Sequence, residues 1–145
     1  MSIETKVEGN PDQITSLASW LTSSLEPAVS TSGDKFSSAR TSLGSEWQGE
    51  TAEAIVSWLG DAVDASDSLS TRMTDISAAL TTYVTVLSST KTEAECVRND
   101  ATSGGLKVNG TVVQEPKDAS DAKKTALYSN LSGRMDAANS NLATA

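Results

Sequence analysis

Ser45-Glu46-Trp47-Gln48-Gly49-Glu50 is the stretch on which the expected fold depends, a short polar break that contains one tryptophan. The long segments on both sides of it have the apolar spacing of helices. A glycine two residues after the tryptophan supplies the backbone freedom that a tight helix-to-helix reversal needs. We therefore predict a turn at Trp47, Gln48 and Gly49 between two antiparallel helices, over residues 11–44 and 51–103.

The first predicted helix begins where Asn10 can cap it and Pro11 can occupy its first position. Its apolar stripe is displaced by about one residue after Pro27. Because proline lacks an N–H and clashes with the preceding turn, we expect Pro27 to kink a single bent helix. The stripe consists of Ile14, Leu17, Ala18, Leu21, Leu25, Val29, Phe36, Ala39 and Leu43.

The second predicted helix carries apolar or small residues every seven positions, in two neighbouring rows. One row is Ile55, Ala62, Leu69, Ile76 and Tyr83, and the other is Leu59, Ser66, Met73, Leu80 and Leu87. A seven-residue repeat is typical of helices that supercoil against a partner helix. We expect the first helix to pair with the first part of this helix, and a third helix to fold back along its last part.

The remaining segments are shorter. After Gly104-Gly105, residues 106–113 predict a small β-hairpin with a type I′ turn at Asn109-Gly110. Pro116 and Asp118 then favour a third helix over residues 117–143. Met1 to Asn10 is expected to be disordered. The predicted fold class is all-α, with an elongated helical hairpin, the small β-hairpin and the third helix in one domain over residues 1–145.

The composition excludes several classes of partner. The chain has 19 acidic and 11 basic residues, a formal net charge of −8, and its basic residues do not cluster. This argues against binding to nucleic acid and to anionic membrane surfaces. No segment approaches the roughly 18 apolar residues of a membrane span, and the amino terminus does not resemble a conventional signal peptide. Taken alone, these features predict a soluble, cytoplasmic protein.

The side chains that usually carry chemistry are scarce. The absence of histidine removes the commonest general base and zinc ligand. Acidic pairs such as Asp61 with Asp64, or Glu93 with Glu95, are present, but Asp64 and Asp67 lie beside the seven-residue repeat, where solvated charges are usual. We therefore predict no catalytic, cofactor or metal site, and a protein that is not an enzyme. The single cysteine, Cys96, favours a buried thiol, with an intermolecular disulfide as the alternative.

The three tryptophans are the remaining candidates for function. Trp20 lies off the apolar stripe, so it is either an exposed binding residue or a boundary residue that covers the seam. Trp58 lies nearer the seam of its own helix, which favours core packing. The candidate contacts with a partner are Trp20, Trp58, Ile55, Leu59 and Leu69.

Two long helices joined at Trp47-Gln48-Gly49, with Ala52 and Ala54 at the start of the second, resemble the WXG superfamily of small proteins exported by type VII (ESX) secretion systems. The opening Val7-Glu8-Gly9-Asn10-Pro11-Asp12 is similar to the start of WXG-like domains at the amino terminus of larger actinobacterial secreted proteins. The resemblance covers roughly residues 7–100. It implies secretion without a signal peptide, and pairing with a copy or another WXG protein into a four-helix bundle.

The chain departs from the family in one respect. Family export often uses a Tyr-x-x-x-Asp/Glu signal beyond the second helix, but Leu87 follows Tyr83 at that spacing and Ser132 follows Tyr128. Three explanations stay open. A partner supplies the signal, a longer native chain supplies it, or the protein is a cytoplasmic coiled-coil adaptor with no role in export.

Overall fold

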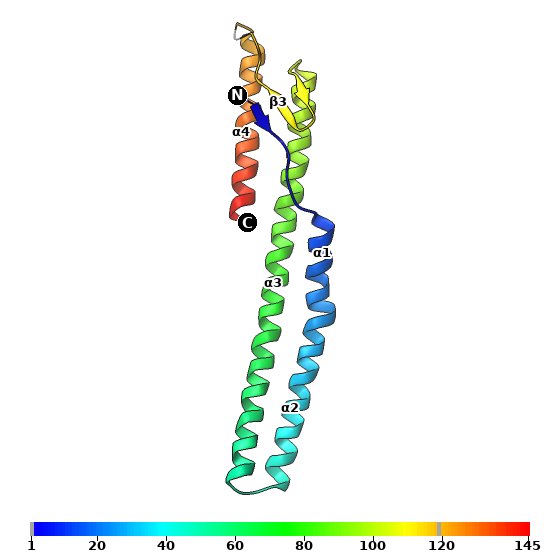
Figure 1. Ribbon diagram of the computed structural model, residues 1–145, viewed down its shortest axis with the longest axis vertical. Helices are drawn as coiled ribbons and strands as arrows, with labels where there is room; N and C mark the ends of the chain where they lie inside the picture. Colours follow the sequence, from blue (N-terminus) through cyan, green and yellow to red (C-terminus); the bar gives the residue numbers. More distant parts are fainter. Residues whose placement is uncertain (1, 119) are drawn as a thin grey trace. The chain divides into compact units, whose positions relative to one another are not determined.

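Helices make up most of the computed structural model, which describes residues 2–118 and 120–145 (Figure 1). The helical elements are α1 (Pro11–Trp20), the π-helical turn η1 (Leu21–Leu25), α2 (Glu26–Glu46), α3 (Glu50–Ser103) and α4 (Ala122–Thr144). The strands are β1 (Ser2–Glu4), β2 (Val108–Asn109) and β3 (Val112–Gln114). The mostly helical prediction is confirmed, as is the long helix, and the sheet contains one strand that was not predicted.

The first helix is continuous from α1 to α2 but changes its hydrogen bonding just before Pro27. The N–H of Glu26 donates to the carbonyl of Leu21, five residues earlier, which is the pattern of a π-helix. Pro27 has no N–H, and in an α-helix its ring would clash with the carbonyl four residues before it. The wider turn accommodates the proline and absorbs one extra residue, which explains the displaced apolar stripe.

The turn between α2 and α3 lies where the sequence predicts it. Trp47 adopts an extended conformation (φ −128°, ψ 136°), and its N–H donates to the carbonyl of Leu43. Gly49 follows with a φ of +113°, a conformation that favours glycine, and its carbonyl accepts from the N–H of Glu53 in the first turn of α3. The predicted turn is confirmed, and the two helices extend closer to it than expected, to Glu46 and from Glu50.

The chain divides into two compact units. We call residues 12–81 the hairpin unit, and residues 1–11 with 82–145 the sheet unit. Helix α3 contributes residues to both units. The assignment of the whole chain to one domain stays a prediction.

Two contacts set the antiparallel packing of the hairpin unit. The hydroxyl of Ser77 donates to the carbonyl of Ala18 at 2.9 Å. Farther along, Gly33 is buried, and a Cβ atom at this position would lie 3.1 Å from Cβ of Ser66. Positions rise along the first helix while they fall along α3, as the predicted antiparallel pairing requires. Glycine at position 33 permits this close approach of the two helices.

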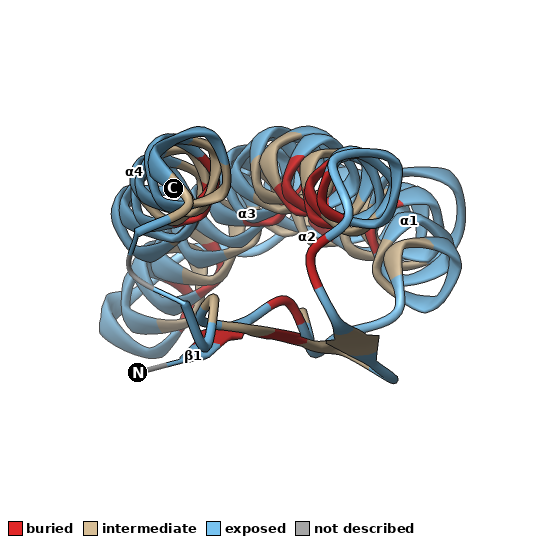
Figure 2. Cartoon of the chain, turned by 90° about the horizontal axis from the view of Figure 1, so that it is seen from above, coloured by how far each residue is buried: buried red, intermediate tan, exposed pale blue. Residues whose placement is uncertain are grey.

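The sheet unit places a three-stranded antiparallel sheet, in the order β1-β3-β2, against α3 and α4. Val113 of the central strand β3 pairs with Ile3 of β1 on one side and with Val108 of β2 on the other. Figure 2, where buried residues are red, shows the strands on one side of these helices. The buried core comprises Ile3, Ala94, Val97, Ala101, Leu106, Val113, Leu131 and Met135.

Strand β1 contradicts the expected disorder of Met1 to Asn10, of which Met1 lies outside the described residues. Beyond β1, Thr5 is 1% exposed, and both its N–H and its hydroxyl donate to the carbonyl of Thr111, at 2.8 and 2.6 Å. Nη1 of Arg98 donates to the carbonyl oxygen and to Oγ1 of Thr5. The expectation failed because the partners of β1 lie about a hundred residues away, beyond the reach of local sequence patterns.

The β-hairpin is present, but its turn and strands are displaced from the prediction. Asn109 pairs with Val112, so Gly110 and Thr111 are the central residues. Only Gly110 has a positive φ, +61°, which matches type II′ rather than the expected type I′. Leu106 belongs to the end of α3 instead of a strand. Its N–H donates to the carbonyl of Ala101 in a Schellman motif, in which Gly105 has a φ of +75°.

Helix α4 begins at Ala122, later than the predicted start at residue 117. Asp121 is its N-cap, because the side chain accepts from the N–H of Lys124 at 3.1 Å. Asp118 instead accepts from the N–H and the hydroxyl of Ser120, which favours a turn over a helix. Ala119, within the predicted helix, lies outside the described residues.

Candidate interaction surface

Large hydrophobic side chains are exposed in the hairpin unit. Among the described residues, the large hydrophobic side chains that are exposed all lie between positions 12 and 81, and they are Leu17, Trp20, Trp47, Trp58, Leu69 and Ile76. The most exposed is Trp58, at 62%. Two packed helices bury only one side of each helix, so a further apolar side remains in contact with water.

On α3, the packed and the exposed apolar residues form separate lines. At about 100° per residue, Trp58, Leu69 and Ile76 fall within about 20° of one another around the helix. Leu59 and Ser77, which are buried against the first helix, lie about a quarter turn away. The first helix thus covers only one side of the seven-residue repeat.

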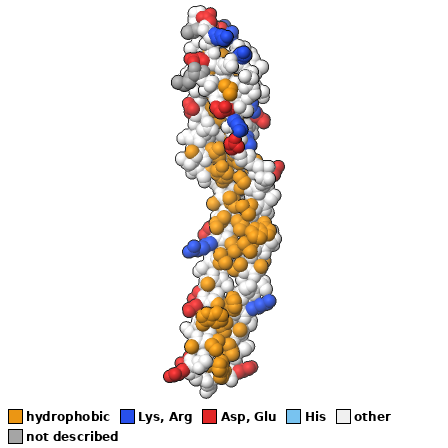
Figure 3. Space-filling model, viewed as in Figure 1, with side chains coloured by type: hydrophobic (Ala, Val, Ile, Leu, Met, Phe, Trp, Pro, Cys, Tyr) orange, Lys and Arg blue, Asp and Glu red, His pale blue; other side chains and the backbone are white. Residues whose placement is uncertain are grey.

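On α1, Leu17 and Trp20 lie on one flank of Ala18, which is buried against α3. Around the helix axis, Leu17 lies about 100° from Ala18 and Trp20 about 160° from it, both in the same direction of rotation. On α3, the exposed line is rotated away from the packed line in this same direction. Because the helices are antiparallel, rotation in the same direction places the exposed residues of α1 and those of α3 on the same side of the hairpin. We call Leu17, Trp20, Trp58, Leu69 and Ile76 the apolar face. Figure 3 shows hydrophobic side chains in a nearly continuous band along the hairpin, with charged side chains at its margins.

The structure sorts the predicted contact residues. Trp20 and Leu69 are exposed, at 49% and 45%, and Ile55 is half-buried. The prediction that Trp58 packs in the core is wrong. Trp58 precedes buried Leu59 by one position, so its side chain points about 100° away from that of Leu59 around the helix. Leu59 itself is 6% exposed, so its side chain is not part of the apolar face.

Two residues of the apolar face were not predicted as contacts. Leu17 belongs to the predicted stripe and Ile76 to the seven-residue repeat, so both had been interpreted as packed positions. The available signal was the width of the stripe. Leu17 and Trp20 extend it beyond the width that a single partner helix covers.

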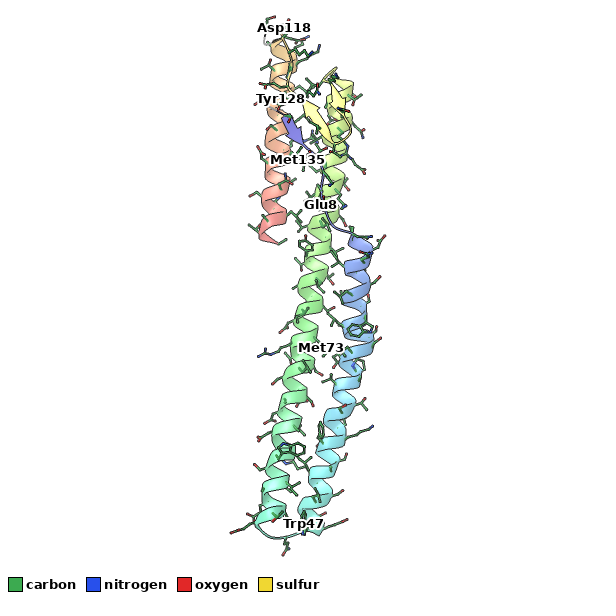
Figure 4. The ribbon with its side chains drawn as sticks, in the orientation of Figure 1. Glu8, Trp47, Met73, Asp118, Tyr128 and Met135 are labelled. Carbon is green, nitrogen blue, oxygen red and sulfur yellow. The ribbon has the colours of Figure 1, made fainter. Side chains whose placement is uncertain are left out.

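Trp47 lies at the turn (Figure 4) and is 45% exposed. A cavity of about 450 Å³ adjoins it, lined by Gly44, Trp47, Gln48, Gly49, Ala52, Glu53 and Val56. The backbone geometry given above accounts for this tryptophan as the residue that ends α2. Its exposed indole adds an aromatic surface at the closed end of the hairpin.

The sheet unit has a groove of about 780 Å³ between α3 and α4. Its walls are mostly small or uncharged side chains, including Thr85, Ser89 and Ala137. At one end the Arg134 guanidinium donates to Glu93 at 2.6 Å and to Asp100 at 2.7 Å, and these carboxylates raise the pKa of Arg134. The charge of this arginine is therefore balanced within the unit.

Other candidate groups lie on the surface. Cys96 is exposed, so the prediction of a buried thiol is wrong. The next residue, Val97, is buried. Consecutive helical residues differ by about 100° around the axis, so Cys96 points away from the core. In the described part of the chain, no cluster of three or more His, Cys, Asp or Glu side chains could hold a metal ion. None of the described helices combines the length and hydrophobicity needed to cross a bilayer.

Comparisons of the chain with protein-family models, with curated proteins and with solved structures found no match.

Proposed function

We propose that this chain is a non-enzymatic, WXG-like protein that acts through helix–helix association and is exported or targeted by a type VII (ESX) secretion system. Its partner is a copy of itself or another WXG-type protein, and the two hairpins form a four-helix bundle. The protein is secreted without a conventional signal peptide and is cytoplasmic before export.

The observation that carries the association is the apolar face. Exposed Trp20 and Trp58 would bury large apolar areas on pairing, at about 25 cal/mol for each Å² removed from water. Tryptophan is also enriched among the residues that dominate binding energies. A second hairpin laid on this face would complete the packing that α1 and α2 leave unfinished on α3.

Support for export comes from the resemblance alone. The turn at Trp47, Gln48 and Gly49 joins two long helices, which is the arrangement that the family motif implies. The missing Tyr-x-x-x-Asp/Glu pattern requires the partner, or a longer native chain, to supply the export signal.

Export is tested in the source organism with a tagged copy of the full chain. Extracellular abundance is compared between cells with an active type VII ATPase and cells that carry an inactivated one. We expect loss of the extracellular protein and intracellular accumulation without the ATPase. Equal extracellular amounts in the two strains would refute the export assignment.

The second candidate function is a cytoplasmic coiled-coil adaptor, which the missing export pattern favours. The adaptor would use the same apolar face but would stay inside the cell with its partner. The two functions therefore differ in localisation, while both require association. A chain that stays monomeric and recovers no helical partner would contradict both.

A further inference from the structure

The turn of the β-hairpin places an asparagine side chain next to an unhindered backbone nitrogen. Asn109 ends β2, Gly110 follows it, and both residues are exposed. A Cβ atom at position 110 would meet nothing within 4 Å, so no neighbouring group crowds this position. Gly110 lies outside the paired strand positions, and within the described residues its N–H donates no hydrogen bond. The Gly110 nitrogen is therefore available as a nucleophile beside the Asn109 amide.

The other asparagines of the chain lack this combination. Asn10 precedes Pro11, which has no N–H. The rest lie inside α3 and α4, where the N–H of each following residue donates to the carbonyl four residues earlier. These helical asparagines are Asn99, Asn130, Asn139 and Asn141. Each is also followed by a residue that carries a side chain, which hinders attack by the backbone nitrogen.

We infer that Asn109 is a site of spontaneous deamidation, in which the Gly110 nitrogen attacks the side-chain amide. A bond forms between this nitrogen and Cγ of Asn109, which closes a cyclic imide. The Cγ–Nδ2 bond breaks, and Nδ2 leaves as ammonia with the proton of the Gly110 N–H. Glycine allows the backbone rotation that ring closure requires, and asparagine is among the thermolabile residues. The inference does not depend on the proposed association or export.

Water opens the imide at either of its two carbonyls and supplies the oxygen of a new carboxylate. Attack at Cγ restores the ordinary main chain and leaves aspartate at position 109. Attack at the main-chain carbonyl leaves isoaspartate, in which the main chain passes through Cβ and is longer by one methylene. Each product carries one more negative charge, so the formal net charge of the chain changes from −8 to −9.

The isoaspartate would lengthen β2 beside the core of the sheet unit. Asn109 pairs with Val112, and the preceding Val108 pairs with Val113, which is fully buried. Val113 also pairs with Ile3 of β1. Because an extra backbone atom shifts the pairing of β2 with β3, the isoaspartyl chain should hold this sheet less tightly. The contacts inside the hairpin unit involve none of these residues.

The reaction is tested on the full chain, which is incubated in mildly alkaline heavy-oxygen water and analysed by peptide mapping with mass spectrometry. We expect the peptide that contains Asn109 to change first, to gain one heavy oxygen and to separate into aspartyl and isoaspartyl forms. Asn109→Gln should remove this signal, because glutamine must close a larger ring. Conversion of Asn109 that is no faster than that of Asn139 in the folded chain would overturn the inference.

The same incubation of the urea-unfolded chain separates the effect of the fold from that of the sequence. Unfolding should accelerate the conversion of Asn99 and Asn139 by at least about tenfold, because their helices must open before they react. Asn109 should accelerate by less than about threefold, because the Gly110 nitrogen is already without a hydrogen bond in the folded chain. An acceleration of Asn109 as large as that of Asn139 would show that the folded turn protects this side chain, which would overturn the inference.

The effect on the sheet unit is measured on the two products after their separation. Hydrogen exchange at the Thr5 amide, which donates to Thr111, reports on the sheet unit, and the fluorescence of the three tryptophans reports on the hairpin unit. We expect Thr5 exchange to accelerate about tenfold in the isoaspartyl chain, with unchanged tryptophan fluorescence. Asn109→Asp is the matched control, because it has the same charge without the extra methylene. Equal Thr5 exchange in the isoaspartyl chain and in Asn109→Asp would overturn the predicted loosening of the sheet.

Discussion

The Ser77 hydroxyl hydrogen bonds to the Ala18 carbonyl across 59 positions of sequence, and both residues are buried. A serine on the packed side of a helix is costly unless its hydroxyl has a partner. Here the partner is a carbonyl of the facing helix, so the bond fixes the register of the hairpin unit. Within the described residues, the neighbouring Ser70 has a buried hydroxyl with no hydrogen-bond partner.

These two serines predict opposite responses to the same substitution. Ser77→Ala should lower the free energy of unfolding by about 1 kcal/mol, because it removes a satisfied hydrogen bond. Ser70→Ala should leave stability unchanged or raise it by up to about 1 kcal/mol, because it removes an unsatisfied hydroxyl. Urea denaturation of the full chain measures both. A larger loss for Ser70→Ala than for Ser77→Ala would contradict the assignment.

Gly33 and Gly44 form a second matched pair within α2. A Cβ atom at position 44 meets nothing within 4 Å, so Gly44→Ala should stabilise the helix by up to about 1 kcal/mol. At position 33 the same gain is opposed by a contact of 3.1 Å with Ser66, so Gly33→Ala should be clearly less stable than Gly44→Ala. Equal thermal stabilities of the two variants would show that the helices do not approach closely there.

Arg98 holds the start of the chain against the sheet unit. Arg98→Met keeps the aliphatic part of the side chain but removes its hydrogen bonds to Thr5. Hydrogen exchange of the Thr5 amide should therefore accelerate about tenfold, because a hydrogen bond from a charged group contributes about 1.5 kcal/mol. Arg72→Met in the hairpin unit is the control and should leave this amide unchanged. Hydrogen exchange followed by NMR gives both values, and an unaffected Thr5 in Arg98→Met would refute the role of the arginine.

The α4 N-cap should be sensitive to acid. The N–H of Lys124 holds the pKa of Asp121 below its ordinary value of 3.8, so the charged side chain stabilises the folded state. Because the pKa of Asp121 is lower in the folded state, this stabilisation is fully present above the pKa of the unfolded state. It is lost as the pH falls through the pKa of the folded state. Asp121→Asn retains a capping side chain without titrating. The melting temperature of the natural chain should therefore fall more than that of the variant as the pH drops below about 4. Parallel pH profiles would contradict the cap.

The exposed thiol of Cys96 gives a test that needs no substitution. A thiol reagent should modify the folded protein at a rate close to that of the urea-unfolded chain, because the side chain is accessible. The measurement is the absorbance of the released reagent over time. Protection of the thiol in the folded state, beyond about tenfold, would indicate that a partner or the fold covers this position.

The sequence predicted those features that depend on local chemistry. The start of α1 at Pro11 follows from proline and its preceding cap, and the reversal at Trp47 follows from a polar break that ends in glycine. The end of α3 follows from Gly104-Gly105. In each case the residues that determine the structure lie within a few positions of it.

The failures required information from distant residues. Strand β1 is three residues long, and its pairing partner begins at Val112. The exposure of Trp58 depends on which side of α3 the first helix covers. The seven-residue repeat alone was compatible with packing on either of two neighbouring sides of α3. The repeat located the seam, and tertiary packing decided which of its residues remained in contact with water.

The pairing of β1 with β3 also sets an order of events during synthesis. Thr5 leaves the ribosome long before Thr111, the residue to which it hydrogen bonds. The sheet unit therefore cannot close until β3 has been translated, whereas residues 12–81 can form their own contacts earlier. In the interval, the nascent hairpin presents its tryptophans to the cell before β1 and β3 have paired.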